Sequence, residues 1–344
     1  MNRFEWVDAG TVADAAGAST VTVAEAMRSR TGEPPSDQVV VVKAGGVDLI
    51  DLMKEGLLTP RRLVNLRGVA GLNVIAQDQD GVLRIGAMAT LAEVGEHPLV
   101  RARYVALADA AARSASPQIR QAATLGGNLL QRPRCWYFRS AQHHCARKGG
   151  EACFAFAGEN QYHAIFDDRG CAIVHPSTAA TALVALGARI EIATPQGGRR
   201  ESRLEDFFVL PEVDIHREND LKPGDIVTAI VLPALGPTAR SVHVKQGERD
   251  SFDWPLADVA VVLDLAADRI CRMASVVLGA AAPVPHRAKA AEAALLGHVV
   301  DESTARAAAS AALTGASALT KNEYKLPIFE TLVRRAILAA AGGA

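Results

Sequence analysis

Four of the five cysteines in this chain fall within one stretch of sequence that runs from Cys135 to Cys171. Nine, seven and seventeen residues separate successive cysteines, and the surrounding segment, residues 132–168, has no periodic pattern of its own. A loop of this length inside a domain is uncommon unless it is functional, and thiolates on one inorganic centre would replace the apolar core that it lacks. The pattern predicts a metal site with the ligands Cys135, Cys145, Cys153 and Cys171.

The spacing of the cysteines favours one kind of centre. Structural zinc sites usually contain close pairs of the form C-x2-C, whereas the four thiolates of a 4Fe-4S cluster each ligate a different iron and accept irregular spacing. We therefore expect a 4Fe-4S cluster, with a zinc site or small buried cysteines as the alternatives. Cys271 lies in a predicted strand far from the other four and is excluded as a ligand.

For the other polar residues of the segment, the sequence gives weaker evidence of a role. His143, His144 and His163 are set aside as ligands because a histidine in a loop is usually a solvated side chain. Positive charges near the cysteines would offset the negative charge of a tetrathiolate cluster. The basic residues in question are Arg132, Arg134, Arg139, Arg147 and Lys148.

Charge and hydropathy exclude several classes of partner. Thirty-seven basic and 38 acidic residues give a net charge of −1, so no global field attracts nucleic acid. The longest apolar runs are shorter than the roughly 20 residues that cross a bilayer, so no membrane span is expected. Residues 1–23 contain three acidic side chains and no apolar core of signal-peptide length, which predicts a cytoplasmic protein.

Strand and helix patterns predict an α+β protein whose first part is of α/β character. Beyond about Pro233 the predicted strands and helices form a separate, compact α+β domain. The predicted strands are residues 38–43, 63–66, 83–88, 189–194, 226–232, 241–245, 259–265 and 274–278. The predicted helices are residues 48–54, one or two within 91–115, then 178–186, 286–296, 303–313 and one that starts at Pro327.

Two glycine pairs provide a second candidate site. Gly45-Gly46 follows a predicted strand, and Gly126-Gly127 forms a predicted turn that leads into the cysteine segment. A glycine pair lets backbone N–H groups approach an anion without a Cβ atom in the way, and a following helix N-terminus adds positive charge. Neither pair matches G-x-G-x-x-G or G-x-x-x-x-G-K-[ST], so diphosphate binding depends on the two pairs together with their surroundings.

Those surroundings resemble a known family. KAGGVDLIDLMK (residues 43–54) and QIRQAATLGGNLLQ (residues 118–131) resemble the two diphosphate loops of the FAD-binding subunit of molybdenum hydroxylases, the medium-subunit family of xanthine dehydrogenase and carbon monoxide dehydrogenase. The cysteine segment resembles the insertion of the periplasmic aldehyde oxidoreductase type, whose FAD subunit also holds a 4Fe-4S cluster. The resemblance implies a two-part FAD-binding domain of the PCMH type over residues 1–235, with the iron-sulfur insertion at about 132–172. It implies a C-terminal domain of the CO dehydrogenase flavoprotein type over residues 236–344.

The same resemblance implies roles for individual residues. A cation at Lys245, near the isoalloxazine ring, would stabilise the anionic reduced flavin. At Thr178 many relatives have an aspartate, and threonine can supply only a hydroxyl group. Phe252 and Trp254 are expected to line the flavin pocket, with packing in the core as the alternative. The implied FAD contacts are Lys43, Ala44, Gly45, Gly46, Val47, Asp48 and Leu49 on one side of the diphosphate, Thr124, Gly126, Gly127 and Asn128 on the other, and Val227 and Lys245 beside the ring.

The implied function is electron transfer in a heterotrimer or its dimer. A partner with a molybdenum cofactor would hydroxylate an aldehyde or N-heterocycle, a partner with 2Fe-2S clusters would relay electrons, and FAD on this chain would pass them to an external acceptor. The alternatives are a free-standing FAD oxidase and a zinc-stapled assembly subunit without a redox role. A partner with a twin-arginine signal would make the complex periplasmic by co-export, which is the alternative to a cytoplasmic location.

Overall fold

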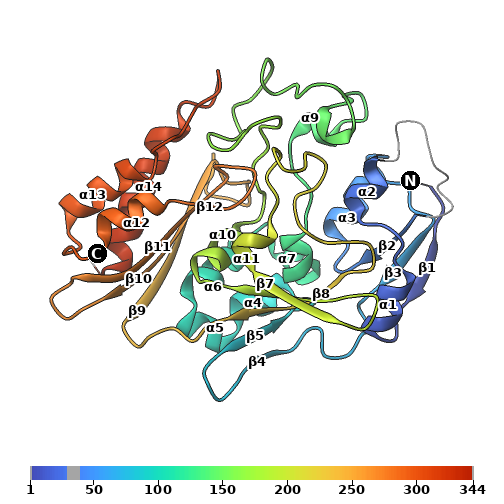
Figure 1. Cartoon of the computed structure of the whole chain (residues 1–344), viewed down its shortest axis with the longest axis horizontal. Helices are drawn as coiled ribbons and strands as arrows, with labels where there is room; N and C mark the ends of the chain where they lie inside the picture. The colour runs from blue at the N-terminus through green and yellow to red at the C-terminus, as the bar shows by residue number, and fades with distance from the viewer. Residues whose placement is uncertain (1, 29–38, 343–344) are drawn as a thin grey trace.

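The computed structural model describes residues 2–28 and 39–342, and its N-terminal part is a small parallel sheet (Figure 1). Its strand order is β1-β3-β2, and helical crossovers join strands that run in the same direction. The predicted strand and helix around the first glycine pair are confirmed, although Gln38 lies outside the described residues. The elements are β1 (Glu5–Asp8), α1 (Val12–Ala18), α2 (Val23–Arg28), β2 (Val40–Lys43), α3 (Val47–Lys54) and β3 (Arg62–Asn65).

The central sheet has five antiparallel strands in the order β4-β5-β8-β6-β7, and the largest apolar cluster fills the space between this sheet and its helices. The predicted helical region 91–115 is divided into three short helices. Pro98 starts the second helix, and Tyr104 separates the second helix from the third. Strand β7, RRESR, is polar throughout and was not predicted. The elements are β4 (Ile75–Gln77), β5 (Leu83–Gly86), α4 (Leu91–Glu96), α5 (Pro98–Arg103), α6 (Val105–Ala112), α7 (Pro117–Ala122), α8 (Leu125–Leu129), α10 (Thr178–Ala185), β6 (Arg189–Ala193), β7 (Arg199–Arg203), α11 (Leu204–Phe207) and β8 (Ile226–Leu232).

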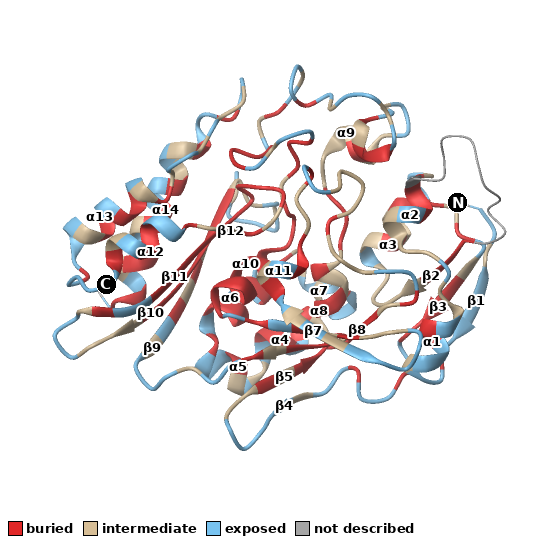
Figure 2. Ribbon diagram, viewed as in Figure 1, coloured by how far each residue is buried: buried red, intermediate tan, exposed pale blue. Residues whose placement is uncertain are grey.

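The C-terminal sheet has the order β12-β11-β10-β9, and its two middle strands, β10 and β11, are buried on both faces along most of their length (Figure 2). Val259 and Val261 of β10 pack toward the last three helices, whereas Ala260 and Val262 join the core of the central layer. The last helix starts at Lys325, so Pro327 lies in its first turn, where its missing N–H costs nothing. The elements are β9 (Ala239–Gln246), β10 (Ala257–Leu265), β11 (Cys271–Gly279), β12 (His286–Arg287), α12 (Lys289–Leu295), α13 (Glu302–Ala311) and α14 (Lys325–Ala340).

The cysteine segment spans the gap between the N-terminal sheet and the C-terminal helices (Figure 1). Its regular structure is limited to α9 (Trp136–Arg139) and one 3-10 turn (Ala146–Lys148). Phe138 packs into the apolar cluster of α3, and Phe166 packs into the cluster of the C-terminal helices. The segment therefore holds both ends of the molecule together. In the ranges that the structure covers, we find no helix with the length and apolar character needed to cross a bilayer.

Candidate functional site

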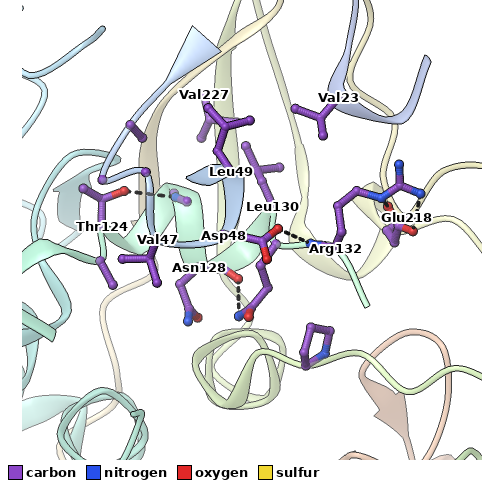
Figure 3. Close-up of a pocket in the computed structure, with 18 of the residues that line it drawn as sticks. Val23, Val47, Asp48, Leu49, Thr124, Asn128, Leu130, Arg132, Glu218 and Val227 are labelled. Atoms are coloured by element: carbon purple, nitrogen blue, oxygen red, sulfur yellow. Dashed lines mark hydrogen bonds and ion pairs between the residues drawn. The ribbon is translucent and has the colours of Figure 1, made fainter. Parts of the chain in front are cut away.

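A cavity of about 660 Å³ lies between the two glycine pairs and extends to the loop between β9 and β10. Gly45, Gly46, Gly126 and Gly127 all line it, although the two pairs are far apart in sequence. The first pair precedes α3 and the second opens α8, so the N-termini of both helices border the cavity (Figure 3). N–H groups in the first turn of a helix have no partner within the helix and can bind an anion. At α8 those of Leu125 and Gly126 donate to the carbonyl oxygens of Ala89 and Ala87, so α3 is the helix whose N-terminus is available.

The first glycine pair has the conformation and space that only glycine provides. Gly46 has φ of +85°, in the left-handed region, and immediately precedes α3. A Cβ atom on Gly45 would collide with the carbonyl oxygen of Ala122, far inside van der Waals contact. The two loops therefore pack directly against each other at a position where any larger residue would separate them.

The second glycine pair corrects one prediction, because it is the first turn of a helix rather than an isolated turn. Thr124 is the N-cap of α8, and its Oγ1 accepts a hydrogen bond from the backbone N–H of Gly127 at 3.2 Å. A Cβ atom on Gly126 would lie 2.9 Å from the Cβ atom of Ala87. The glycines thus let α8 pack closely on the strand side of the cavity, where the backbone N–H groups of Leu125 and Gly126 donate to the carbonyl oxygens of Ala89 and Ala87.

Most of the residues predicted to contact FAD line this one cavity, and one does not. The Nζ atom of Lys43 donates to Asn65 Oδ1 at 3.2 Å and lies 5.0 Å from the centre of the Trp6 ring. Lys43 is not among the lining residues. The residues that line the cavity as predicted are Ala44, Gly45, Gly46, Val47, Asp48, Leu49, Thr124, Gly126, Gly127, Asn128, Val227 and Lys245.

Two polar side chains at the cavity wall have protein partners. The side-chain oxygen of Asn128 accepts a hydrogen bond from Ser177 Oγ at 2.5 Å, which leaves its amide nitrogen as the remaining donor. The hydroxyl group of Thr178 is 2.7 Å from Ser114 Oγ and 3.3 Å from the carbonyl oxygen of Ala110. Thr178 therefore supports the wall of the cavity through contacts within the protein.

The far end of the cavity is formed by β9 and the loop that follows it. Lys245 donates to the carbonyl oxygen of Arg113 at 3.1 Å, and burial lowers the pKa of its amine while the carboxylate of Asp258 opposes that shift. Phe252 and Trp254 line the cavity but remain 57% and 52% exposed, so they form its entrance and not a packed core. The guanidinium of Arg134 lies 4.9 Å from the Trp254 ring, a cation–π contact.

Several lining residues were missed by the sequence analysis. Val23 lies on the short helix α2, whose sequence carries no binding motif. Glu218 is buried at the cavity wall and forms an ion pair with Arg132, 2.9 Å from Nε to Oε2 (Figure 3). The two residues are 86 positions apart, so no local pattern could have linked them.

A second, much smaller cavity is lined by all four predicted cysteine ligands. Cys145 and Cys171 are buried, Cys135 and Cys153 are partly buried, and none of them is in a disulfide. Cys271 lies in β11, away from this cavity. Within residues 2–28 and 39–342, no three His, Cys, Asp or Glu side chains are grouped as the ligands of a single metal ion. The four thiols instead surround a common space, an arrangement compatible with a centre in which each thiolate binds a different iron.

The thiols around the small cavity have different acidities. Burial raises the pKa of Cys135 to about 11. A hydrogen bond from the Cys153 thiol lowers the pKa of Cys171 to about 6, and the Arg147 guanidinium adds to this shift. The Arg147 Nε atom donates to Cys171 Sγ at 3.4 Å. Cys171 is therefore the thiol best prepared to bind a cation as a thiolate.

His163, which the sequence analysis set aside, lies in the same small cavity. Its Nε2 atom is 3.2 Å from Cys135 Sγ. Burial lowers the pKa of His163 to about 4, and the charge of Lys325 contributes, so the ring is neutral at pH 7. Beside a thiolate, the tautomer with its proton on Nε2 makes the hydrogen bond. His163 would thus donate to Cys135 when that sulfur binds a metal as a thiolate.

The basic residues of the cysteine segment form specific contacts and do not act only as a general balance of charge. Arg147 contacts a cysteine sulfur directly. Arg132, Arg134 and Arg139 instead pair with carboxylates of the larger cavity or of α3. Lys148 donates to the carbonyl oxygens of Tyr137 and Ser140, and its charge lowers the pKa of Cys145 against the effect of burial.

Comparison with known proteins identifies the class of protein that has this architecture. The model of the FAD binding domain in molybdopterin dehydrogenase matches residues 2–235, and that of the CO dehydrogenase flavoprotein C-terminal domain matches residues 242–340. The chain is similar in fold to carbon monoxide dehydrogenase from Hydrogenophaga pseudoflava, with a TM-score of 0.72 and 24% identity over 100% of this chain and 99% of that one. Quinoline 2-oxidoreductase from Pseudomonas putida 86 matches at the same TM-score and identity, over 100% of this chain and 98% of that one.

Named relatives of this chain belong to the same class of protein. The aldehyde oxidoreductase FAD-binding subunit PaoB of Escherichia coli K12 is 37% identical over 254 residues, which cover 73% of this chain and 78% of that protein. The nicotine 6-hydroxylase medium subunit of Paenarthrobacter nicotinovorans is 29% identical over 89% of this chain and 91% of its own length. The chain belongs to the family of FAD-binding oxidoreductase subunits of molybdenum hydroxylases. The predicted family and fold class are confirmed.

Proposed function

We propose that this chain is the electron-transfer subunit of a heteromeric molybdenum hydroxylase, with FAD in the larger cavity and a 4Fe-4S cluster on Cys135, Cys145, Cys153 and Cys171. The arrangement that carries the proposal is the pair of cavities: one built on two glycine loops, the other lined by four thiols. A molybdenum-cofactor subunit would oxidise the organic substrate, and a 2Fe-2S subunit would deliver its electrons. The similarity to an aldehyde oxidoreductase subunit supports aldehydes as substrates of the complex, with N-heterocycles as the second class.

The residues of the larger cavity suit a dinucleotide with an anionic centre. Backbone N–H groups at the start of α3 would bind the diphosphate from one side, and the amide nitrogen of Asn128 would donate from the other. Gly45 allows this because it lets the two loops lie close together. Lys245 would hold a positive charge beside the ring system. Phe252 and Trp254 stand at the entrance, where they would limit the access of water while an external acceptor approaches. When bound, FAD accepts electrons one at a time and releases two together.

The small cavity suits an iron-sulfur cluster by the chemistry of its donors. Four cysteines supply the full ligand set of a cubane. Arg147 donates a hydrogen bond to Cys171, and His163 would donate to Cys135 once that sulfur is a thiolate bound to iron. Hydrogen bonds to cluster sulfurs raise the reduction potential. Both donors belong to the cysteine segment itself.

Purification with the partner subunits under anaerobic conditions tests the proposal. We expect flavin absorbance, broad iron-sulfur absorbance and about four irons per complex in addition to those of the 2Fe-2S subunit, the composition of one cubane. Serine at Cys135, Cys145, Cys153 or Cys171 should abolish the iron signal of this chain, whereas the matched variant Cys271→Ser should retain it. Zinc without flavin would favour an assembly subunit. Flavin with substrate turnover by the isolated chain would favour a free-standing oxidase.

A further inference from the structure

The two cavities are joined by a continuous set of ion pairs and hydrogen bonds. We propose that Asp48 and Glu218 are positioning residues that couple them, so that a filled cysteine cavity tightens FAD binding and bound FAD tightens the hold on iron. This inference rests on the proposed function for the identity of the two cofactors. It assigns to Asp48 a role other than the FAD contact that its position beside the glycine loop implied.

Asp48 connects the first glycine loop to the cysteine segment. It lies in the first turn of α3, and its side chain is only 14% exposed. Its Oδ2 atom accepts a hydrogen bond from the backbone N–H of Arg132 at 2.8 Å. Its Oδ1 atom is 2.6 Å from Arg139 Nη2 and 2.8 Å from Arg134 Nη2. These three arginines flank Cys135, so the carboxylate at the FAD loop holds the backbone before a predicted iron ligand and a side chain on each side of it.

Glu218 makes a second connection, deeper in the molecule. It lines the FAD cavity and is 5% exposed. Its Oε2 atom is 2.9 Å from Arg132 Nε, and its Oε1 atom accepts from Arg147 Nη1 at 2.6 Å. Arg147 lines the cysteine cavity and donates from Nε to Cys171 Sγ. One carboxylate and one guanidinium therefore link the wall of the FAD cavity to a cysteine sulfur.

Apolar packing reinforces these links. Cys135, Cys145 and Phe138 belong to the same buried cluster as Leu49 and Leu52 of α3. A shift of the cysteine segment would therefore disturb the helix that forms one side of the FAD cavity, as well as the ion pairs.

The coupling has a direct energetic cause. The cysteine segment has little regular structure of its own, so its conformation would depend on the metal that its thiolates bind. If the segment rearranged on loss of iron, Arg147 and Arg139 would withdraw, leaving Glu218 buried without one partner and Asp48 without its strongest one. An unpaired buried charge is strongly destabilising, and here the cost falls on the FAD cavity. Sites that share one such element change each other's affinity by the same factor.

FAD titration measures the coupling without reference to turnover. The complex is stripped of flavin, and the dissociation constant for FAD is measured by flavin fluorescence quenching, once with iron in place and once after anaerobic chelation. We expect FAD to bind about tenfold or more tightly to the iron-loaded protein, within the usual range of coupling between sites. The ratio of the FAD dissociation constant without iron to that with iron measures the coupling. In the Asp48→Asn and Glu218→Gln variants this ratio should fall toward one.

Asp51→Asn is the matched control. Asp51 lies one turn further along α3 and contacts the same two guanidinium groups, Arg134 at 3.4 Å and Arg139 at 3.1 Å, but its side chain is 46% exposed. Its ratio should stay within about twofold of the parent, because exposed ion pairs contribute little. A purely structural defect would weaken FAD binding in both iron states and leave the ratio unchanged, so the ratio separates coupling from damage.

The outcomes distinguish this inference from the function on which it depends. Parent protein that binds neither iron nor FAD overturns the proposed function itself. Parent protein that binds both, with equal FAD affinity before and after iron removal, overturns the coupling alone, as does an unchanged ratio in Asp48→Asn. If the buried Glu218→Gln variant does not fold, Asp48→Asn decides the question, because its carboxylate is closer to the surface and asparagine keeps its size.

Discussion

Gly45 lies against the carbonyl oxygen of Ala122, in a space that a single Cβ atom would already overfill. The contact joins the loop before α3 to the residues just before α8, and both loops border the larger cavity. The distance between the two proposed diphosphate-binding loops is therefore fixed by the absence of a side chain at one position.

Gly45→Ala should separate the two loops and weaken FAD binding by about tenfold or more, because the clash is with backbone that cannot rotate away. The overpacking should also destabilise the chain by about 1–3 kcal/mol. Flavin content after purification and FAD titration measure the first effect, and thermal unfolding measures the second. Gly17→Ala is the control, since its Cβ atom would meet nothing within 4 Å. Full flavin retention in Gly45→Ala would contradict the role of this contact.

Local patterns predicted much of the fold. The β-branched run before Gly45 and the helical spacing after it indicated β2 and α3 within a residue or two. The apolar run of β10 is typical of a strand buried on both faces, but it could not reveal which helices cover each face, because these come from two parts of the chain. The exposed, charged strand β7 gave no apolar signal at all.

The candidate site was predictable as two separate motifs but not as a connected one. The glycine pairs and the cysteines stand out because their chemistry is concentrated in short stretches. The bond between Asp48 and Arg139 joins residues 91 positions apart, and that between Glu218 and Arg147 joins residues 71 apart. Such pairings depend on the tertiary fold. The direction of the Lys43 side chain is unpredictable for a related reason, since proximity in sequence to Gly45 does not decide that the side chain turns toward Trp6.

Lys245→Met should make the flavin harder to reduce. Lys245 lines the larger cavity, and removing its charge removes a favourable interaction with the anionic reduced flavin. We expect the two-electron midpoint potential to fall by about 30 mV or more, equivalent to about 1.4 kcal/mol. Spectroelectrochemical titration of the flavin band measures it. Lys289→Met, an exposed lysine on α12, should leave the potential unchanged. Equal potentials in the two variants would remove Lys245 from the flavin environment.

His163→Ala should lower the reduction potential of the proposed cluster while its irons remain bound. The variant removes the donor to Cys135 Sγ, and a lost hydrogen bond to a charged acceptor corresponds to a shift on the order of 50 mV for a one-electron couple. Redox titration followed by electron paramagnetic resonance measures the shift. His163→Gln, whose amide can still donate, should recover part of it, and the exposed His144→Ala should have no effect. A loss of iron instead of a shift in potential would make His163 a ligand.

His175→Asn should reduce the sensitivity of the chain to mild acid. Burial lowers the pKa of His175 to about 3, so the folded chain keeps this ring neutral while the unfolded chain protonates it below about pH 6.5. The unfolded state then binds more protons, and the free energy of unfolding falls as the pH drops through this window, by up to about 1.4 kcal/mol per pH unit. Asparagine retains an acceptor for the backbone N–H of Ser177, which now donates to the His175 Nδ1 at 3.3 Å, but it cannot take up a proton.

Between pH 7 and pH 5 the parent should therefore lose more stability than His175→Asn does, even if the variant is less stable at neutral pH. Thermal midpoints at pH 7, 6 and 5 measure it, over a range in which most carboxylates remain ionised. His298→Asn, at an exposed histidine, should lose stability with falling pH as steeply as the parent does. Parallel pH profiles for the parent and His175→Asn would mean that another group accounts for the acid sensitivity, with His163, whose pKa burial lowers to about 4, as the next residue to replace.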